Sequence, residues 1–440
     1  MQAYFYQLAD LIGAQLRGNE QFKCWFSAES TDFVRFNRSA LRQAGHVRQL
    51  NLSVDLIDGR RHCSASAALA GQLEADRETL LRIIGTLRAQ LPALPEDPHL
   101  LIATEVCSSE HIAPSRLPAA ADIVREVLHA AAQVDLVGIL ACGPMYRGFA
   151  NAFGQRNWHE AATFNLDWSL YLSRDKAVKS SYAGEAWDSA AFNEKMRSAM
   201  LQLVLLQRVP ITVKPGAYRA YLTPTAMHEI IGMFNWDGFS EKSLRTRQSA
   251  VRRMRDEGVR LNPAVTLSED TANGIAPGFQ GEGFIKPPRV ALVEQGVLTG
   301  SMIAPRTAME YGIASNGAGG GEAMQSIDLA AGTLAMSDAL AELDTGIFIG
   351  NLWYLNFSDR AHCRITGMTR FATFWVEDGE IKAPLNVMRF DESLYRLLGD
   401  NLLSLTAERE LLLDSSTYQE RSTASALLPG ALVKDFTFVL

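Results

Sequence analysis

The sequence predicts an α+β protein, with a mixed α/β N-terminal domain at residues 1–210 and a β-rich C-terminal domain at residues 211–440. Three observations support this prediction. Helical and strand-like segments alternate in the first half, a strong helix ends just before Pro210, and strands with Gly-rich turns dominate afterwards. The 440 residues, 47% of them hydrophobic, suffice for two or three domains with sizeable cores.

The first elements are a helix, a group of strands and a second helix. Apolar residues have helical spacing in YFYQLADLIGAQL near the N-terminus. Strand-like sequence follows in FKCWFSAE, DFVRFN and RQLNLSVDLIDGRRHCSASAAL, where Asp58–Gly59 predicts a hairpin turn. The spacing of leucines then predicts a helix over residues 72–91, and the prolines of LPALPEDPH end it.

Helices and strands also alternate in the rest of the first half. A helix is predicted over residues 117–133, followed by the buried strand DLVGILACG and by further strands to about residue 182. The helix that closes this half covers residues 188–208, with Asp188 as its N-cap.

Strands dominate the second half. The segments PRVALVEQGVLTGSMIA, GIFIGNLWYLNF and RFATFWVEDGEIKAPL are strand-like, and VEQG and VEDGE resemble hairpin turns. One helix is predicted among them, in TPTAMHEIIGMF, because Thr223 is a good N-cap residue and Pro224 suits the first helical position.

This helix contains half of a zinc-peptidase signature. In HExxH, two imidazoles one turn apart bind zinc and the glutamate acts as general base to the bound water. His228 and Glu229 match its first half, but the next ligand position is Gly232, followed by Met233, a poor zinc ligand. The pair is therefore either two ordinary helix residues or part of a site completed by other ligands.

Two further candidates are weaker. The Gly-rich run SNGAGGGEA lacks the P-loop pattern and indicates a loop near a cleft, with Asn316, Gly319 and Gly320 as candidate substrate-binding residues. His362–Cys363 could suggest a base and a nucleophile, but neighbours along an extended strand point to opposite faces. A buried thiol beside a surface histidine is the favoured interpretation.

Charge and composition argue against nucleic-acid binding and against a membrane span. A net charge of −7 does not favour nucleic-acid binding, and no stretch of 18 apolar residues predicts a membrane span. The N-terminus has no basic region followed by an apolar block, so no secretory signal is expected. Five scattered cysteines without a CxxC pair suggest free thiols in a reducing cytoplasm.

The order of several segments along the chain resembles that of the TldD/PmbA family, also called modulator of DNA gyrase. These segments are ESTDFVRFN, YRGFANAFGQ, KPGAYRAYLTPTA, FSEKSLRTRQ, LSEDTANGIAPGFQGEGF, APRTAMEYGIASNGAGGG and TGMTRFATFWVEDGEIKAPLNVMRF. The resemblance implies an α+β N-terminal domain, a β-rich C-terminal domain and two kinds of subunit. TldD-like subunits bind the metal through HExxxH and a late cysteine, whereas TldE/PmbA-like subunits lack these ligands and pair with TldD to degrade flexible peptides.

Transferred to this chain, the motif is incomplete. His228 and Glu229 match the first histidine and the catalytic glutamate of HExxxH, Met233 occupies the second histidine position, and no cysteine follows Cys363. The resemblance therefore favours a TldE/PmbA-like subunit that needs no metal of its own, binds peptide, and forms a homodimer or a heterodimer with a TldD-like subunit.

Two alternatives stay open at this point. The chain could be a self-sufficient zinc peptidase in which His362, Cys363 or an acidic residue completes the site around His228 and Glu229. It could also be a non-enzymatic regulator that binds gyrase or another protein, although only the family's name suggests this.

Overall fold

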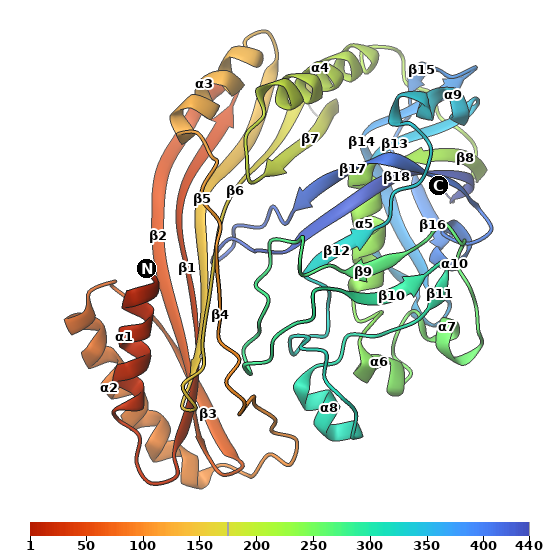
Figure 1. Ribbon diagram of the computed structural model, residues 1–440. Helices are drawn as coiled ribbons and strands as arrows, with labels where there is room; N and C mark the ends of the chain where they lie inside the picture. The colour runs from red at the N-terminus through yellow and green to blue at the C-terminus, as the bar shows by residue number, and fades with distance from the viewer. Residues whose placement is uncertain (174–175, 440) are drawn as a thin grey trace.

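Two β-sheets face each other across the molecule (Figure 1). The computed structural model describes residues 1–173 and 176–439. Helices and sheets occur in both halves, so the α+β prediction is confirmed. The division into domains at residue 210 stays a prediction, although the first sheet lies before this position and the second sheet after it.

The first sheet consists of long antiparallel strands in the order β3-β2-β1-β5-β6-β4, with β7 also paired to β6. Only β4 pairs in parallel, with β6, among the described strands of this sheet. Asp58 ends β2 and Gly59 follows it, which confirms the predicted β2–β3 hairpin. The strands are β1 (Gln21–Asn37), β2 (Ala40–Asp58), β3 (Arg61–Ala68), β4 (Ser109–Ile112), β5 (Asp135–Asn151), β6 (Arg156–Ser173) and β7 (Lys176–Gly184).

Four helices cover the apolar face of this sheet. Helices α1 (Gln2–Gly13) and α2 (Leu73–Gln90) pack on one end, and α3 (Ala120–Ala130) and α4 (Ser189–Leu205) on the other (Figure 1). Side chains alternate between the faces of a strand, so every second residue joins these cores. The buried members of the sheet include Phe26, Leu52, Leu140, Trp158 and Trp168.

The opposite face of the first sheet lies toward the second half of the chain and carries polar side chains beside apolar ones such as Met145 and Phe149. Many of its polar side chains are buried, which requires hydrogen-bonding partners. Two of these partners are carbonyl groups of the second half, at Ile275 and Arg421. The buried polar residues of this face include Ser27, Glu29, Thr31, Arg147, Asn157, His159, Thr163 and Asn165.

The second sheet contains a closed ring. Strand β8 pairs in parallel with β13 and antiparallel with β18, and β18 continues through β16 and β14 back to β13. The ring strands are β8 (Gly216–Leu222), β13 (Gly346–Asp359), β14 (Arg364–Glu377), β16 (Arg389–Ser393) and β18 (Ser425–Phe438). The other strands are β9 (Leu267–Glu269), β10 (Val290–Glu294), β11 (Val297–Leu298), β12 (Ser326–Leu329), β15 (Glu380–Pro384) and β17 (Leu402–Leu413).

Helix α5 (Pro224–Asn235) is the main helix of the second half and packs against β13 and β18. Short helices, which the sequence did not predict, fill the connections: α6 (Glu241–Arg245), α7 (Arg252–Asp256), α8 (Pro305–Tyr311), α9 (Ala339–Leu343) and α10 (Leu394–Leu397). In the part of the chain that the structure describes, no helix has the length and apolar character needed to cross a membrane.

Candidate functional site

Helix α5 begins as the sequence predicts. The Thr223 hydroxyl accepts a hydrogen bond from the Ala226 N–H (3.2 Å), and Pro224 occupies the first turn. The apolar side of the helix is buried in the core of the second half, through Met227, Ile230, Ile231, Met233 and Phe234. The polar side is therefore the side left to carry chemistry.

His228 and Met233 lie on different sides of α5. His228 is half-buried, whereas only 6% of the Met233 surface is exposed and its side chain belongs to the core. Five residues correspond to about 140° around a regular helix. The position that would hold the second imidazole of HExxxH thus points into apolar packing.

The surroundings of α5 favour the neutral forms of both candidate residues. Burial lowers the pKa of His228, and the Asp414 carboxylate opposes this shift. Glu229 is open to solvent on one side, yet the displacement of water by the surrounding protein raises its pKa, opposed by Lys179. Lys179 is on β7 and Asp414 follows β17, so the polar side of α5 is influenced by charges from both halves.

The donor atoms around α5 do not fit a zinc site. Structural and catalytic zinc sites use at least three protein ligands from Cys, His, Asp and Glu. Within residues 1–173 and 176–439, no group of three such side chains is close enough to hold a metal ion. The Asp414 carboxylate is the charge that acts on His228 from outside the helix.

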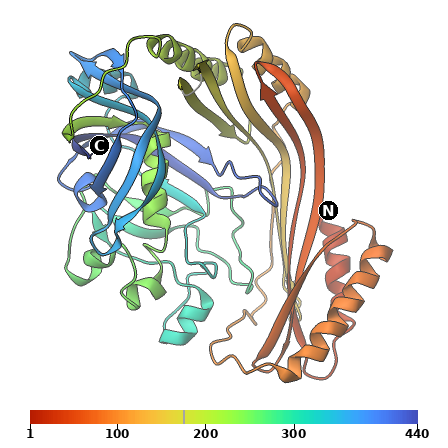
Figure 2. The same ribbon diagram turned by 180° about the vertical axis from the view of Figure 1, so that it is seen from behind.

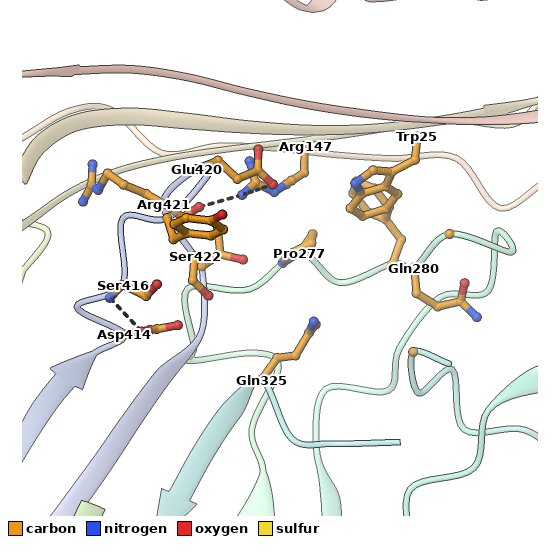
Figure 3. A pocket seen from close by; sticks show the side chains of 15 residues that line it. Trp25, Arg147, Pro277, Gln280, Gln325, Asp414, Ser416, Glu420, Arg421 and Ser422 are labelled. Carbon is orange, nitrogen blue, oxygen red and sulfur yellow. Dashed lines mark hydrogen bonds and ion pairs between the residues drawn. The ribbon is translucent and has the colours of Figure 1, made fainter. Parts of the chain in front are cut away.

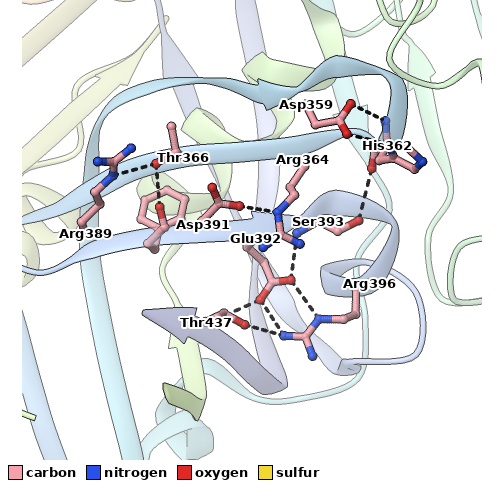
Figure 4. Close-up of polar contacts among 11 residues, drawn as sticks. Asp359, His362, Arg364, Thr366, Arg389, Asp391, Glu392, Ser393, Arg396 and Thr437 are labelled. Atoms are coloured by element: carbon pink, nitrogen blue, oxygen red, sulfur yellow. Dashed lines mark hydrogen bonds and ion pairs between the residues drawn. The ribbon is translucent and has the colours of Figure 1, made fainter. Parts of the chain in front are cut away.

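The structure also places His362 and Cys363 outside this region. They lie in the turn between β13 and β14, where His362 is exposed and bonds Asp359 (Nδ1 to Oδ2, 2.7 Å), as Figure 4 shows. Cys363 is fully buried, and burial raises the pKa of its thiol. A buried thiol beside a surface histidine is thus confirmed, but the backbone is a turn with a φ of 48° at Cys363 rather than the extended strand considered.

A pocket of about 420 Å³ lies between the two halves (Figure 3). The first sheet contributes Trp25 and Arg147, and the indole lies 5.6 Å from the ring of Phe279. The remaining wall comes from the second half and is mostly polar. Its members are Pro277, Gln280, Gly281, Gly319, Gln325, Asp414, Ser416, Tyr418, Glu420, Arg421, Ser422 and Thr423.

Of the candidate residues in the Gly-rich loop, one lines this pocket and another has a structural role. Gly319 lines the pocket, and Gly320 is the next residue along the loop. Asn316 instead anchors the loop, because its side chain accepts from the Ile303 N–H (2.8 Å) and donates to the Ser301 carbonyl (2.7 Å). Their role in substrate binding stays a prediction.

Sequence reasoning missed most of the pocket. The DSST segment at residues 414–417 forms a turn in which the Ser416 N–H donates to the Asp414 carboxylate (2.9 Å). No local pattern indicates that this turn meets Trp25, since the two are almost 400 residues apart in sequence. The 85% exposure of Tyr418 is a property of the folded chain, so it gave no signal in the sequence either.

Two buried arginines attach the segment 414–424 to the first sheet. Arg421 donates to the carbonyl groups of Gly143 (3.1 Å) and Thr163 (3.2 Å) and to the Thr163 hydroxyl (2.6 Å). Arg147 donates to the Arg421 carbonyl (3.0 Å) and lies 3.7 Å from the Glu420 carboxylate. These contacts fix one wall of the pocket.

A buried histidine on the same sheet predicts a pH dependence of stability. His159 is 5% exposed and its Nε2 lies 3.0 Å from the Ile275 carbonyl. Burial and the nearby His111 lower its pKa to about 4, the Ile275 carbonyl opposes this, and Arg147 and Lys286 lower it further. The native state therefore holds His159 neutral, whereas the unfolded chain protonates it below about pH 6.5.

The stabilising contribution of neutral His159 is complete above about pH 6.5 and is lost as the pH falls toward 4. The loss amounts to about 3 kcal/mol at most. We expect His159→Asn to flatten the pH dependence of unfolding over this interval, measured by urea unfolding of both proteins. An equal acid-induced loss in the variant would show that other groups cause it.

Comparisons with known proteins identify one family and one fold. The family model described as PmbA/TldA metallopeptidase C-terminal domain matches residues 215–439. No curated protein matches the sequence. Among solved structures, TldE from Thermococcus kodakarensis is 15% identical with a TM-score of 0.78, and the alignment covers 99% of this chain and 100% of that one.

Two more solved structures have the same fold. A candidate modulator of DNA gyrase from Thermotoga maritima is 14% identical with a TM-score of 0.76, covering 99% of this chain and 100% of the other. A candidate modulator of DNA gyrase from Bacteroides thetaiotaomicron is also 14% identical, with a TM-score of 0.75 and coverage of 98% and 97%. At such identities the likeness shows a common fold.

Proposed function

Because this chain belongs to the PmbA/TldA metallopeptidase family, as its sequence motifs indicate, we propose that it is a TldE/PmbA-like subunit of a cytoplasmic peptidase that processes flexible peptides. The absence of a second metal ligand on α5 supports this subunit type. Met233 is packed in the core where HExxxH would place its second imidazole, and the described side chains offer no set of three metal ligands. The metal and its water are then supplied by a TldD-like partner subunit.

The role of this chain in the proposed assembly is to bind extended peptide. The pocket between the halves offers aromatic surfaces at Trp25, Phe279 and Tyr418 together with the amides of Gln280 and Gln325. A second cavity of about 440 Å³ adjoins the start of α5 at Thr223 to Thr225 and has apolar walls, including Leu205 and Phe348. Aromatic and amide groups suit the apolar side chains and the backbone of a peptide, which would pair with a sheet edge.

The alternatives receive less support. A self-sufficient zinc peptidase needs further ligands around His228 and Glu229, and His362 and Cys363 lie in a separate turn. A regulator of gyrase finds support only in the names of two solved structures. In this proposal the TldD-like subunit supplies the metal. An assembly of two copies of this chain would therefore lack the metal that the peptidase reaction needs.

Metal content and a substitution at Glu229 test the proposal. We expect the purified chain to retain far less than one zinc ion, even after incubation with zinc. We also expect Glu229→Gln to change the peptidase activity of the complex with a TldD-like subunit by less than about twofold. Loss of a general base would lower the rate by roughly 10² to 10⁴.

Metal content and the Glu229→Gln variant can also refute the proposed subunit type. One tightly bound zinc per chain, together with activity abolished by Glu229→Gln, would establish a self-sufficient enzyme. The exposed Glu310→Gln, on α8, is the matched control for the loss of one charge.

A further inference from the structure

A strongly basic segment lies in the second half of this acidic chain. Residues 242–260 contain seven Lys or Arg residues and two Asp or Glu residues, a net charge of +5, whereas the whole chain has −7. The segment forms α6, α7 and the turn between them. In both views of the molecule α7 lies on the side away from the first sheet (Figures 1 and 2).

Several of these cations are neutralised locally. Arg245 contacts Glu241 (2.5 Å), and Arg253 contacts Glu257 (2.7 Å). In contrast, Arg247 and Arg252 have no acidic partner within 4 Å among the residues that the structure describes. A local excess of positive charge therefore remains at these two positions.

The two unpaired arginines line a surface pocket of about 430 Å³ together with Arg360. Arg360 belongs to the turn between β13 and β14 and is held in place by aromatic rings, 4.5 Å above Phe357 and 5.2 Å above Trp236. The pocket contains one carboxylate, that of Asp237, which lies 3.6 Å from Arg360. Three guanidinium groups against one carboxylate leave a net positive charge of two.

The geometry points to a binding site for a multivalent oxyanion, which we call the Arg247–Arg360 pocket and define by Arg247, Arg252, Arg360, Gln248, Ser249 and Asp237. Guanidinium groups are planar forks that match phosphate and carboxylate oxygens in pairs. The volume lies in the range of small-ligand sites. A polyphosphate or a phosphorylated small molecule carries the negative charge that would balance the net positive charge of the pocket.

This site is separate from the peptide pocket between the halves, since the two have no lining residue in common. It does not depend on the proposed peptidase role. Guanidinium groups of Arg247 and Arg252 would replace water around the anion, and the immobilised Arg360 would lose little conformational freedom on binding.

Calorimetric titration of the full chain with tripolyphosphate at low ionic strength tests the site. We expect saturable binding to one site per chain, weakened roughly tenfold or more by Arg252→Ala and partly restored by Arg252→Lys, which keeps the charge but not the fork. The matched control is Arg260→Ala, because Arg260 is an exposed cation of the same segment outside the pocket. This control is expected to change the affinity by less than about twofold.

Two outcomes would overturn the inference. One is the absence of saturable binding up to millimolar tripolyphosphate. The other is an equal loss in Arg252→Ala and Arg260→Ala, which would indicate diffuse attraction to a basic surface. A parallel titration with citrate identifies the source of the oxyanion: equal affinity for citrate extends the site to carboxylates, and binding of tripolyphosphate alone restricts it to phosphates.

Discussion

Replacing Arg421 with methionine is expected to lower the free energy of unfolding by about 3 to 5 kcal/mol, the largest effect of any single substitution proposed for this protein, because three buried acceptors would lose their donor. Arg421 is 5% exposed, and its guanidinium donates to three acceptors on the first sheet, at Gly143 and Thr163. Methionine keeps much of the volume but donates no hydrogen bond, so these acceptors would be buried without a partner. Urea unfolding followed by tryptophan fluorescence measures the loss.

The control for this prediction is Arg125→Met. Arg125 is exposed and pairs with Asp122 on α3, so its loss should cost less than about 1 kcal/mol. If Arg421→Met were as stable as this control, the attachment of residues 414–424 to the first sheet would contribute little. The expected loss would also release one wall of the pocket between the halves and weaken peptide binding there.

Local signals in the sequence predicted the longer helices α1 to α5, but not the short ones, because the groups that define the ends of a long helix lie within a few residues of it. Asp188 accepts from the N–H groups of Ala190 and Ala191 and begins α4 as predicted. Thr223 does the same for α5, and the Asp378–Gly379 turn joins β14 to β15 within the VEDGE segment. Each of these features depends on contacts between near neighbours in sequence.

The pairing of distant strands could not be predicted in this way. Strand β8 lies between β13 and β18, more than 100 residues further along the chain, and nothing in GAYRAYL specifies these neighbours. The contacts around the polar side of α5 could not be predicted from local sequence either. The influence of Asp414 on His228 and of Lys179 on Glu229 arises only after both sheets have formed.

Substitution of Met233 by histidine restores the HExxxH pattern in the sequence but is expected not to restore a metal site. The new imidazole would enter a core in which Met233 is 6% exposed, among Ile230, Phe234 and their neighbours. A polar ring buried there without a hydrogen-bond partner costs about 1 to 3 kcal/mol, and the altered shape adds to this. We therefore expect a lower melting temperature than wild type, and no increase when zinc is added.

Met233→Leu separates packing from polarity, because it keeps the volume and should cost less than about 1.5 kcal/mol. A variant Met233→His that binds one zinc ion per chain and melts at a higher temperature with zinc would contradict the prediction. A metal site needs several ligands on one side of the helix at once. In this chain the second position is part of the core, and the acid that acts on His228 is Asp414, in the segment after β17. Metal binding would therefore require coordinated changes in α5 and in the segment after β17.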